Sequence, residues 1–273
     1  MAQDEQKTIN PIIVGGKTAL ADIDPHGTCG YGGDKVSAAV LLTELKVQLQ
    51  QLQTLVYAGA SHKILVVLQA MDTGGKDGVL RSVFTGVNPQ GMRVASFKAP
   101  SAEELKHDYL WRVHHEMPPK GMLHVFNRGH YEDVLITRVH GLIDDATAKR
   151  RFRQINDFEA MAVEEGTIIL KFFLHISKAE QKERLETRLK EPTRQWKFNI
   201  NDVAEREHWD DYQRVYQDAL NATSTKNAPW YVVPADRKWL RDLYVASVLV
   251  QTLSALDMQF PAVAGLKKIV IKD

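Results

Sequence analysis

A short glycine-rich stretch, MDTGGKDG at residues 71–78, has the composition of a phosphate-binding loop. It follows the apolar run KILVVLQA and leads into a helical pattern from about Lys76, which is the strand, loop and helix order that such a loop requires. Adjacent glycines let several backbone N–H groups turn towards one anion, and the helix N-terminus and a lysine add positive charge. We therefore predict phosphate or nucleotide binding by Gly74, Gly75, Lys76, Asp77 and Gly78.

The loop departs from the usual pattern at both ends, because Ala70 replaces the first glycine and Asp77 replaces the Ser or Thr that normally binds Mg²⁺. Carboxylates beside a phosphate repel it unless a divalent cation lies between them, so Asp72 and Asp77 indicate Mg²⁺ bound with a phosphate chain. We assign the metal-linked catalytic role to Asp72, whereas Asp77 either joins it or only caps the helix. The alternative is a glycine-rich turn with an ordinary surface lysine.

A second polar cluster follows the apolar run GMLHVF and contains Asn127, Arg128 and Glu132. Ligands of open parallel sheets bind beyond the carboxyl ends of the strands, so this cluster is expected to face the glycine-rich loop. Arg128 offers a planar fork of donors for phosphate, and Glu132 offers a carboxylate. Asn127 stands where phosphate-loop enzymes usually end this strand in Asp. A polar turn with one structural salt bridge remains the alternative.

Five short apolar runs, each next to helical patterns, predict the elements that position these clusters. The runs are KILVVLQA (63–70), RVASF (93–97), GMLHVF (121–126), TIILKFFLHI (167–176) and WYVVP (230–234). Runs that are apolar on both faces are typical of buried parallel strands, and their alternation with helices indicates repeated βαβ units. We expect an α/β three-layer sandwich of the P-loop kinase-like type, with a parallel sheet of about five strands covered by helices on both sides.

The remaining segments complete the expected organisation. Residues 1–33 are rich in glycine and polar residues, so they are expected to form an N-terminal extension that covers the surface or stays mobile. A helix begins after Asp34, because apolar residues recur at helical spacing from Leu41 to Val56. A single P-loop domain is expected over residues 34–273, with a helical lid over about 177–227, where no strand pattern occurs.

Composition excludes several classes of protein. The chain has 273 residues, and its net charge is only +1, so any anion site must be a local cluster and nucleic-acid binding is not favoured. Cys29 is the only cysteine, which excludes an internal disulfide and fits a reducing compartment. No signal-peptide pattern and no apolar run of about 20 residues occurs, so we expect a cytoplasmic protein without membrane contact.

Four stretches in this order resemble the polyphosphate kinase 2 family, whose members move phosphoryl groups between inorganic polyphosphate and nucleotides. They are MDTGGKDG, FNRGHYEDVLITRV, RLKEPTRQWKF and PWYVVPADRKW, and the resemblance extends from about Lys35 to Leu253. It implies catalytic roles for Asp72, Lys76, Asn127 and Arg128, with Mg²⁺ bound near Asp72. The YED triplet at 131–133 resembles the class that accepts both AMP and ADP. Members more often have Ser at the place of Gly129.

The resemblance also implies a homo-oligomer, for which the long helix from Val36 to Val56 is a candidate interface, and adenine or guanine nucleotides as substrates. Transfer to an ionised nucleotide phosphate needs charge neutralisation and alignment rather than a strong base. A polyphosphate donor needs a path lined by cations, for which the lid and the central segment offer Arg184, Arg188, Lys190, Arg194, Lys197, Arg112 and Lys120. A solvated, salt-bridged helix face explains Arg184 and Arg188 equally well.

Three alternatives are weighed against this hypothesis. An ATP-dependent nucleoside monophosphate kinase would use the same fold and lid. A nucleotide switch or a polyphosphate-binding protein without turnover is a further possibility, although the guanine-reading Asn-Lys-x-Asp motif of GTPases is absent. Zinc binding by His107, His114 and His115 is not favoured, because adjacent histidines diverge on a helix and no further ligand follows at a suitable spacing.

Overall fold

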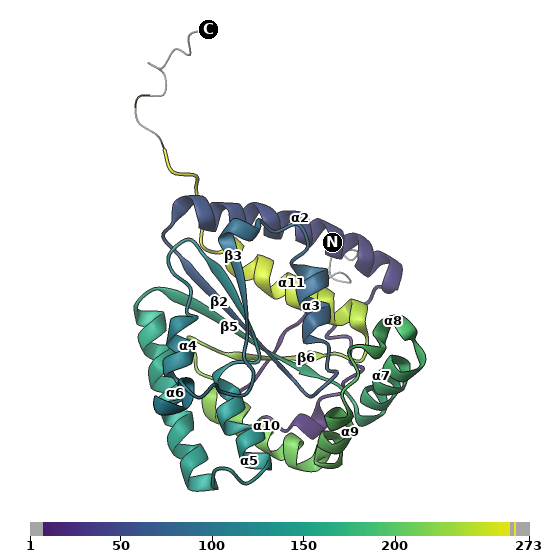
Figure 1. The fold of residues 1–273 in the computed structure, drawn as a ribbon. Helices are drawn as coiled ribbons and strands as arrows, with labels where there is room; N and C mark the ends of the chain where they lie inside the picture. The colour runs from purple at the N-terminus through teal and green to yellow at the C-terminus, as the bar shows by residue number, and fades with distance from the viewer. Residues whose placement is uncertain (1–7, 263–264, 266–273) are drawn as a thin grey trace.

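A computed structural model describes residues 8–262 and 265, and its centre is a six-stranded sheet (Figure 1). The strand order is β1-β6-β5-β2-β4-β3. All neighbours are parallel except β1 and β6, which pair antiparallel. The strands are β1 (Ile12–Ile13), β2 (Lys63–Ala70), β3 (Met92–Ser96), β4 (Leu123–Asn127), β5 (Thr167–His175) and β6 (Trp230–Pro234).

Helices cover both faces of the sheet. One layer contains α2 (Lys35–Gly59), α3 (Lys76–Val83) and α11 (Lys238–Ser254), and α11 packs against both of the others (Figure 1). The opposite layer contains α4 (Trp111–His115), α5 (Ile136–Val139), α6 (Asp145–Glu164) and α10 (Trp209–Thr223). Short 3₁₀ helices are η1 (Leu20–Asp22), η2 (Pro89–Gly91), η3 (Glu104–Lys106) and η4 (His130–Val134). The expected three-layer α/β sandwich is confirmed.

Four of the five apolar runs form strands that are covered on both faces, whereas β3 at the edge of the sheet is largely exposed, contrary to expectation. From Ile64 to Leu68 in β2, every residue has 0% exposed surface, and the sheet pairs β2 with β4 on one side and β5 on the other. Helix α2 begins where the pattern predicted, because the side chain of Asp34 accepts a hydrogen bond from the Ser37 N–H and the Ser37 hydroxyl accepts one from the Asp34 N–H. None of the helices in residues 8–262 is long and apolar enough to cross a membrane.

The sheet has one strand more than expected, and that strand comes from the first 33 residues. Ile12 pairs with Val232 and Ile13 with Tyr231, so β1 covers the edge of β6. Four further side chains of the segment are buried: Ile9, Val14, Leu20 and Tyr31. The sequence did not predict this strand, because two residues form no periodic pattern, whereas the exposed edge of β6 provides backbone groups that need partners.

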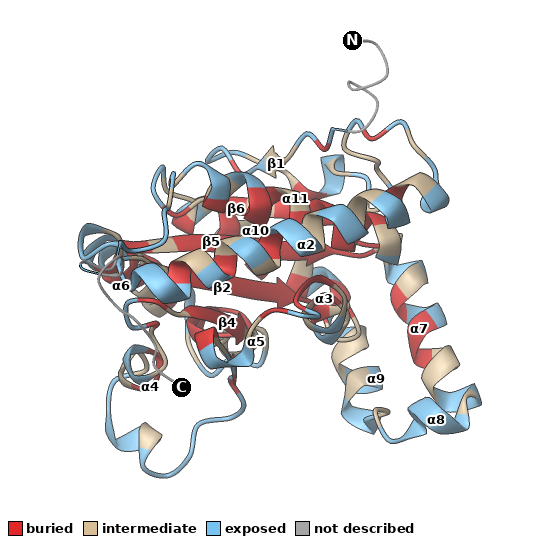
Figure 2. Cartoon of the chain, turned by 90° about the horizontal axis from the view of Figure 1, so that it is seen from above, coloured by how far each residue is buried: buried red, intermediate tan, exposed pale blue. Residues whose placement is uncertain are grey.

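The segment expected to be a lid divides into two parts. Helices α7 (Lys178–Lys190), α8 (Pro192–Gln195) and α9 (Ile200–Glu207) project from the body (Figure 2). Helix α10 instead packs on the sheet layer and buries Trp209, Tyr212, Val215 and Tyr216. These positions have the spacing of one helical face, which the high density of charged residues around them concealed. The projecting part therefore ends near residue 207 rather than 227.

Candidate active site

The glycine-rich loop has a backbone that only a few residue types tolerate. Gly75 has a φ of 107°, and a Cβ atom built there would lie 2.1 Å from Nη1 of Arg241. A Cβ at Gly78 would lie 2.8 Å from Nη2 of the same arginine. Thr73 also has a positive φ, 61°. The glycines thus let Arg241 lie against the loop and the first turn of α3, and any side chain at Gly75 would displace this guanidinium.

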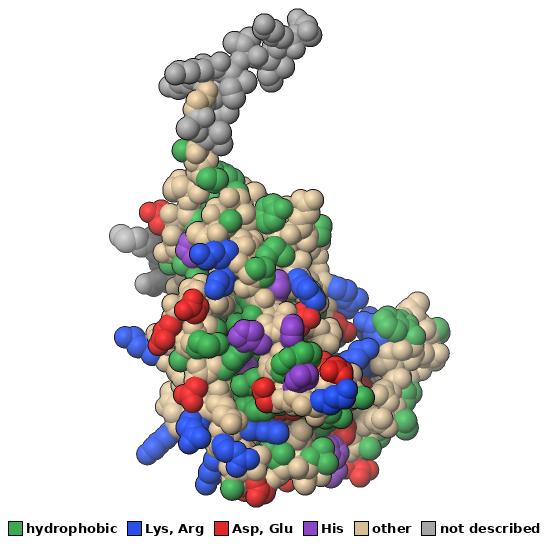
Figure 3. Space-filling view, turned by 60° about the vertical axis from the view of Figure 1, so that its left-hand side comes forward, with side chains coloured by type: hydrophobic (Ala, Val, Ile, Leu, Met, Phe, Trp, Pro, Cys, Tyr) green, Lys and Arg blue, Asp and Glu red, His purple; other side chains and the backbone are tan. Residues whose placement is uncertain are grey.

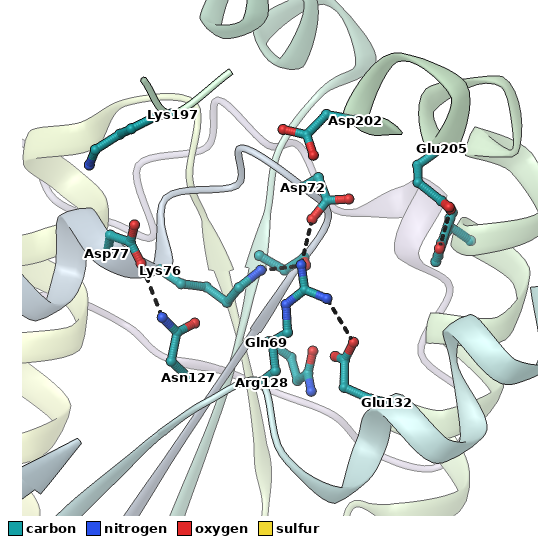
Figure 4. Close-up of polar contacts among 12 residues, drawn as sticks. Gln69, Asp72, Lys76, Asp77, Asn127, Arg128, Glu132, Lys197, Asp202 and Glu205 are labelled. Atoms are coloured by element: carbon teal, nitrogen blue, oxygen red, sulfur yellow. Dashed lines mark hydrogen bonds and ion pairs between the residues drawn. The ribbon is translucent and has the colours of Figure 1, made fainter. Parts of the chain in front are cut away.

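Lys76 is enclosed beneath the loop rather than exposed on its surface. It is 9% exposed, and its Nζ donates a hydrogen bond of 2.9 Å to the carbonyl oxygen of Ala70 (Figure 4). Burial lowers the pKa of Lys76, Arg128 lowers it further, and Asp72 and Glu132 act in the opposite direction. The ammonium group is therefore held in one place, next to the glycines, with few water molecules to compete for its charge.

Arg128 joins the two clusters that the sequence placed in separate motifs. Its guanidinium lies 2.9 Å from Oδ1 of Asp72 and 3.1 Å from Oε2 of Glu132 (Figure 4). The residue has a φ of 76°, and its N–H donates to the carbonyl of Leu68 at the end of β2. Although burial opposes the charge, Glu132 and Asp72 raise the pKa of Arg128, so it stays protonated.

Asn127 makes the second link between the clusters. Its side-chain amide donates a hydrogen bond of 3.0 Å to Oδ1 of Asp77, in the first turn of α3 (Figure 4). Asp77 therefore does not act as the N-cap, which is Gly75. The structure thus brings Asp72, Lys76, Asp77, Asn127, Arg128 and Glu132 together at the carboxyl edge of β2 and β4, as the position of both motifs after parallel strands predicted.

An open cavity of about 850 Å³ lies between this loop, the start of α11 and the projecting helices α7 to α9, which are called the lid below. Its lining includes nine basic and four acidic side chains, which corresponds to a local charge of +5 in a chain whose net charge is +1. A second, narrow cavity lies on the other side of Asp72 and Arg128, where Glu132, Tyr212 and Tyr216 line it. Asp72 and Arg128 border both cavities, so a group bound in either one would contact them.

The lid cations differ in how free they are to bind a ligand. Arg188 lines the larger cavity and is paired with Asp202 at 3.0 Å. Arg194 and Lys197 also line it, whereas Lys190 pairs with Glu186 on the outer surface. Arg184 is 8% exposed, and all three of its nitrogens are hydrogen-bonded, to Glu180, Thr73 and Ala235. Arg184 is therefore part of the supporting structure.

The two further cations suggested for the donor path lie elsewhere. Arg112 donates to the carbonyl of Lys98 and pairs with Asp133, outside the cavity next to the loop. Lys120 is exposed and precedes β4, so it lies at the opposite edge of the sheet from the loop. The sequence could have placed Lys120 at the amino end of the strand, because it directly precedes the run GMLHVF, whereas the place of Arg112 depends on how α4 packs.

Several residues of the larger cavity were missed by the sequence analysis. Lys238 and Arg241 begin α11, one turn apart, and Arg81 lies on α3. The rule that ligands bind beyond the carboxyl ends of strands could have identified Lys238 and Arg241, because they follow the last strand, β6. Asp202 on α9 was also missed, and only the tertiary structure brings it to the loop.

Asp72 and Asp202 are the described carboxylates best placed for a divalent cation. Their side chains lie beside each other (Figure 4), and burial together with the charge of Asp72 raises the pKa of Asp202. Within residues 8–262, no three His, Cys, Asp or Glu side chains form a metal cage. Mg²⁺ commonly binds through one or two carboxylates and substrate phosphates, so these two residues fit an ion that arrives with a phosphate chain.

The histidines around Trp111 make contacts with aromatic rings. Figure 3 shows several histidines close together on the face over α4. His107 stacks on Trp111 with 4.1 Å between ring centroids, and His115 meets the same ring edge-on. His114 turns towards Phe158. The rings of the adjacent His114 and His115 therefore point in different directions, as expected for neighbouring positions on a helix.

A buried ion pair supports the polar residues that follow β4. Lys171 on β5 and Glu159 on α6 have side chains that are 0% and 1% exposed, and their charged atoms are 2.5 Å apart. Glu159 also accepts hydrogen bonds from His130 and from the hydroxyl of Tyr131, and Lys171 donates to the carbonyl of Thr223. This network fixes η4, the helix that carries Glu132 and follows Arg128.

Comparison with known proteins agrees with this geometry. The family model described as Polyphosphate kinase 2 (PPK2) matches residues 34–261. A relative from Meiothermus ruber named AMP/ADP-polyphosphate phosphotransferase is 52% identical over 90% of this chain and 92% of its own length. An ADP-polyphosphate phosphotransferase of Rhodopseudomonas palustris is 46% identical over 78% of each chain. The crystal structure of Polyphosphate Kinase 2 from Arthrobacter aurescens TC1 matches with a TM-score of 0.90 and 44% identity, over 92% of this chain and 90% of that one. The chain therefore belongs to the polyphosphate kinase 2 family.

Proposed function

We propose that this protein transfers phosphoryl groups reversibly between inorganic polyphosphate and AMP or ADP, with Mg²⁺ as the metal. The observation that carries the proposal is the position of Arg128, whose ion pairs with Asp72 and Glu132 place one guanidinium between two cavities. A transferred phosphoryl group needs this kind of site, because its charge must be neutralised while donor and acceptor oxygens align. Relatives named for AMP/ADP-polyphosphate and ADP-polyphosphate transfer support the substrate pair.

We assign the phosphate chain to the larger cavity. Its net charge of +5 offers a polyanion more than the single lysine of an ordinary phosphate loop. Residues that line it from three elements are Lys76 and Arg81 on α3, Arg188 on α7, and Lys238 and Arg241 on α11. Such a broad cationic surface fits a long polyphosphate better than the γ-phosphate of ATP alone.

We assign the acceptor nucleotide to the side of Arg128 where the narrow cavity lies, beside Glu132 and the rings of Tyr212 and Tyr216; this cavity is only about 20 Å³, so α9 and α10 must move apart from η4 to admit a nucleotide. Aromatic rings next to polar groups are typical of sites that hold a nucleoside. Glu132 belongs to the YED triplet, which supports acceptance of both AMP and ADP. GDP is a named substrate of a Mycobacterium tuberculosis relative that is 30% identical, so guanine nucleotides are part of the proposal.

The chemistry then rests on charge and position. Lys76 and Arg128 would hold the transferring group and neutralise the charge that develops on its oxygens. Asn127, by its bond to Asp77, would keep the first turn of α3 at its distance from β4. The acceptor is a phosphate oxygen that is already ionised at neutral pH, so no residue is needed as a general base. Mg²⁺ held by Asp72, with Asp202 beside it, would neutralise charge between the phosphates when bound.

A matrix of donors and acceptors tests the proposal. Purified protein with Mg²⁺ is incubated with polyphosphate or ATP as donor and with AMP, ADP, GMP or GDP as acceptor, and the products are separated by ion exchange. Polyphosphate should phosphorylate AMP and ADP, Lys76→Ala should abolish the reaction, and Lys120→Ala at the opposite edge should leave it unchanged. Phosphorylation of AMP by ATP alone would establish a nucleoside monophosphate kinase instead. Binding of polyphosphate without any turnover would establish a binding protein.

We further propose that the protein forms a homo-oligomer through α2 and works in the cytoplasm. Val36, Val40 and Val47 share the outward face of α2 and are 72%, 58% and 48% exposed. Isolated exposed apolar residues are common, but three at helical spacing on one long helix are typical of an interface. The cytoplasmic location rests on the single cysteine of the chain.

A further inference from the structure

Helix α7, at the base of the lid, holds two successive carbonyl groups of the phosphate loop. The side-chain amide of Gln181 donates 3.0 Å to the carbonyl of Asp72, and Nη1 of Arg184 donates 3.0 Å to the carbonyl of Thr73. Gln181 is 1% exposed and Arg184 is 8% exposed. Both side chains are thus enclosed, and they contact the backbone of the loop rather than its reactive side chains.

The loop needs this support because its conformation is unfavourable in isolation. Thr73 has a φ of 61°, a left-handed conformation that β-branched residues rarely adopt. Within the described residues, no bond of a regular helix or sheet holds its carbonyl, which accepts a hydrogen bond from Arg184. The conformation therefore persists only while neighbouring structure imposes it, which is what a hydrogen bond from a buried guanidinium does.

The two bonds also set the direction of the N–H groups. The peptide bond is planar, so a carbonyl that is held in place fixes the N–H of the next residue in the opposite direction. Gln181 thereby orients the N–H of Thr73, and Arg184 orients that of Gly74, which closes the turn to Met71 at 2.9 Å. The N–H of Gly74 is thus kept within the turn, the N–H of Thr73 is directed away from Gln181, and α7 sets the orientation of both peptide groups.

The same two side chains are anchored on their other sides. Arg206 on α9 donates 2.9 Å to Oε1 of Gln181 and 2.7 Å to the carbonyl of Lys178. Arg184 also donates to Glu180 and to the carbonyl of Ala235, just after β6. A continuous path of hydrogen bonds therefore runs from α9 of the lid through Gln181 to the loop.

We propose that Gln181 and Arg184 are positioning residues that hold the peptide groups of the phosphate loop in their binding conformation, and that Arg206 links α9 to them. The effect on phosphate affinity rests on the proposed function, whereas the effect on the loop does not. Movement of α9 would break the hydrogen bond between Arg206 and Gln181, and Gln181 could then lose its bond to the carbonyl of Asp72. The conformations of the lid and the loop would therefore be coupled.

Gln181→Glu isolates the contact with the loop. A glutamate has nearly the same size and still accepts from Arg206, but it has no N–H to donate to Asp72. The matched control is Lys182→Gln, because Lys182 is the next residue of α7 and its side chain is 67% exposed. Arg184→Met and Arg184→Lys form a second pair, since lysine keeps the charge and can restore one of the three bonds.

Hydrogen–deuterium exchange of the free protein measures the first outcome without any substrate. We expect exchange in residues 71–76 to rise about ten-fold in Gln181→Glu, the factor that corresponds to one lost hydrogen bond, with β5 unchanged. Lys182→Gln should match the parent. Unchanged exchange of the loop in Gln181→Glu would overturn the proposal, as would equal increases in the loop and in β5, because that result indicates general destabilisation.

Steady-state kinetics measures the second outcome. The KM for polyphosphate should rise about ten-fold in Gln181→Glu and in Arg184→Met, while kcat changes less than about three-fold. Gln181 also lines the narrow cavity, so the KM for AMP is diagnostic in Arg184→Met, where it should stay within about three-fold. Arg184→Lys should recover part of the affinity that Arg184→Met loses. A fall in kcat at unchanged KM would overturn the assigned role. A parent protein without activity would refute the proposed function, and the exchange experiment would still decide the role of Gln181.

Discussion

The buried pair of Lys171 and Glu159 allows a quantitative test of how the second cluster is supported. Lys171→Met keeps the length of the side chain but removes its charge and its bonds to Glu159, Tyr131 and Thr223. The variant leaves a carboxylate that is 1% exposed, with hydrogen bonds from His130 and Tyr131 but without a cation nearby. The perturbation is therefore a buried, uncompensated negative charge.

The expected loss of stability follows from this uncompensated charge. Removal of one partner of a buried ion pair typically costs about 3–5 kcal/mol, which is a large part of the about 5–15 kcal/mol that stabilises an ordinary domain. The double variant Lys171→Met with Glu159→Gln contains no buried charge, and its Gln still accepts from Tyr131. We expect it to be more stable than Lys171→Met by about 2 kcal/mol, because the penalty for the isolated carboxylate disappears.

Urea unfolding at pH 7, followed by tryptophan fluorescence, gives the free energies of the parent, both single variants and the double variant. Trp230 is a suitable probe because Lys171 lies 5.3 Å from its ring centroid. A loss of less than about 1 kcal/mol in Lys171→Met would refute the reasoning, since it would show that the charge is not isolated. Strictly additive free energies would refute it too, because they would exclude coupling between the two residues.

Three further predictions concern the site and the assembly. Arg128→Lys should lower kcat on the order of 10²-fold, because lysine cannot contact Asp72 and Glu132 as a planar fork; Arg93→Lys, at an exposed pair with Glu116, is the control, and an equal effect there would contradict a local role. Burial lowers the pKa of Lys76, so kcat/KM for polyphosphate should fall with rising pH below the ordinary lysine value of 10.5, as the amine becomes neutral. In kcat, which is measured at saturating polyphosphate, the fall should occur at higher pH, because a bound anion favours the charged amine. A fall of kcat/KM that begins only at or above pH 10.5 would contradict the effect of burial. Val40→Asp with Val47→Asp should shift the protein to a smaller oligomer in size-exclusion chromatography with light scattering, whereas an unchanged mass would exclude the α2 interface.

Much of the fold was predictable from local patterns. Four of the five apolar runs are buried strands, and Ile64 to Leu68 shows why: a strand covered on both faces needs apolar residues at every position. Asp34 predicted the start of α2, since a cap involves only neighbouring residues, and the structure shows that Ser37 completes this cap. The two residues of β1 carry no such pattern, because their strand exists only through the edge of β6.

The candidate site shows the same division. The sequence placed Asp72, Lys76, Asn127 and Arg128 at one edge of the sheet, because parallel strands end on the same side. The sequence could not show whether Arg184 is exposed or buried. Its spacing of four residues from Glu180 fits a solvated ion pair on the helix surface as well as a buried contact that supports the loop. The choice depends on the carbonyl of Thr73, which is 111 residues away in the chain.

By itself, the sequence determined the type of chemistry: contiguous residues 71–78 form a phosphate loop wherever a strand precedes and a helix follows them. Tertiary structure alone decided which charges act together, such as Arg128 with Asp72, Asp202 beside Asp72, and Gln181 behind the loop. The physical reason is the distance in sequence over which the interactions act. Backbone preferences and helix caps depend on neighbouring residues, whereas the pairing of distant charges depends on how the helices pack on the sheet, which a local sequence pattern does not show.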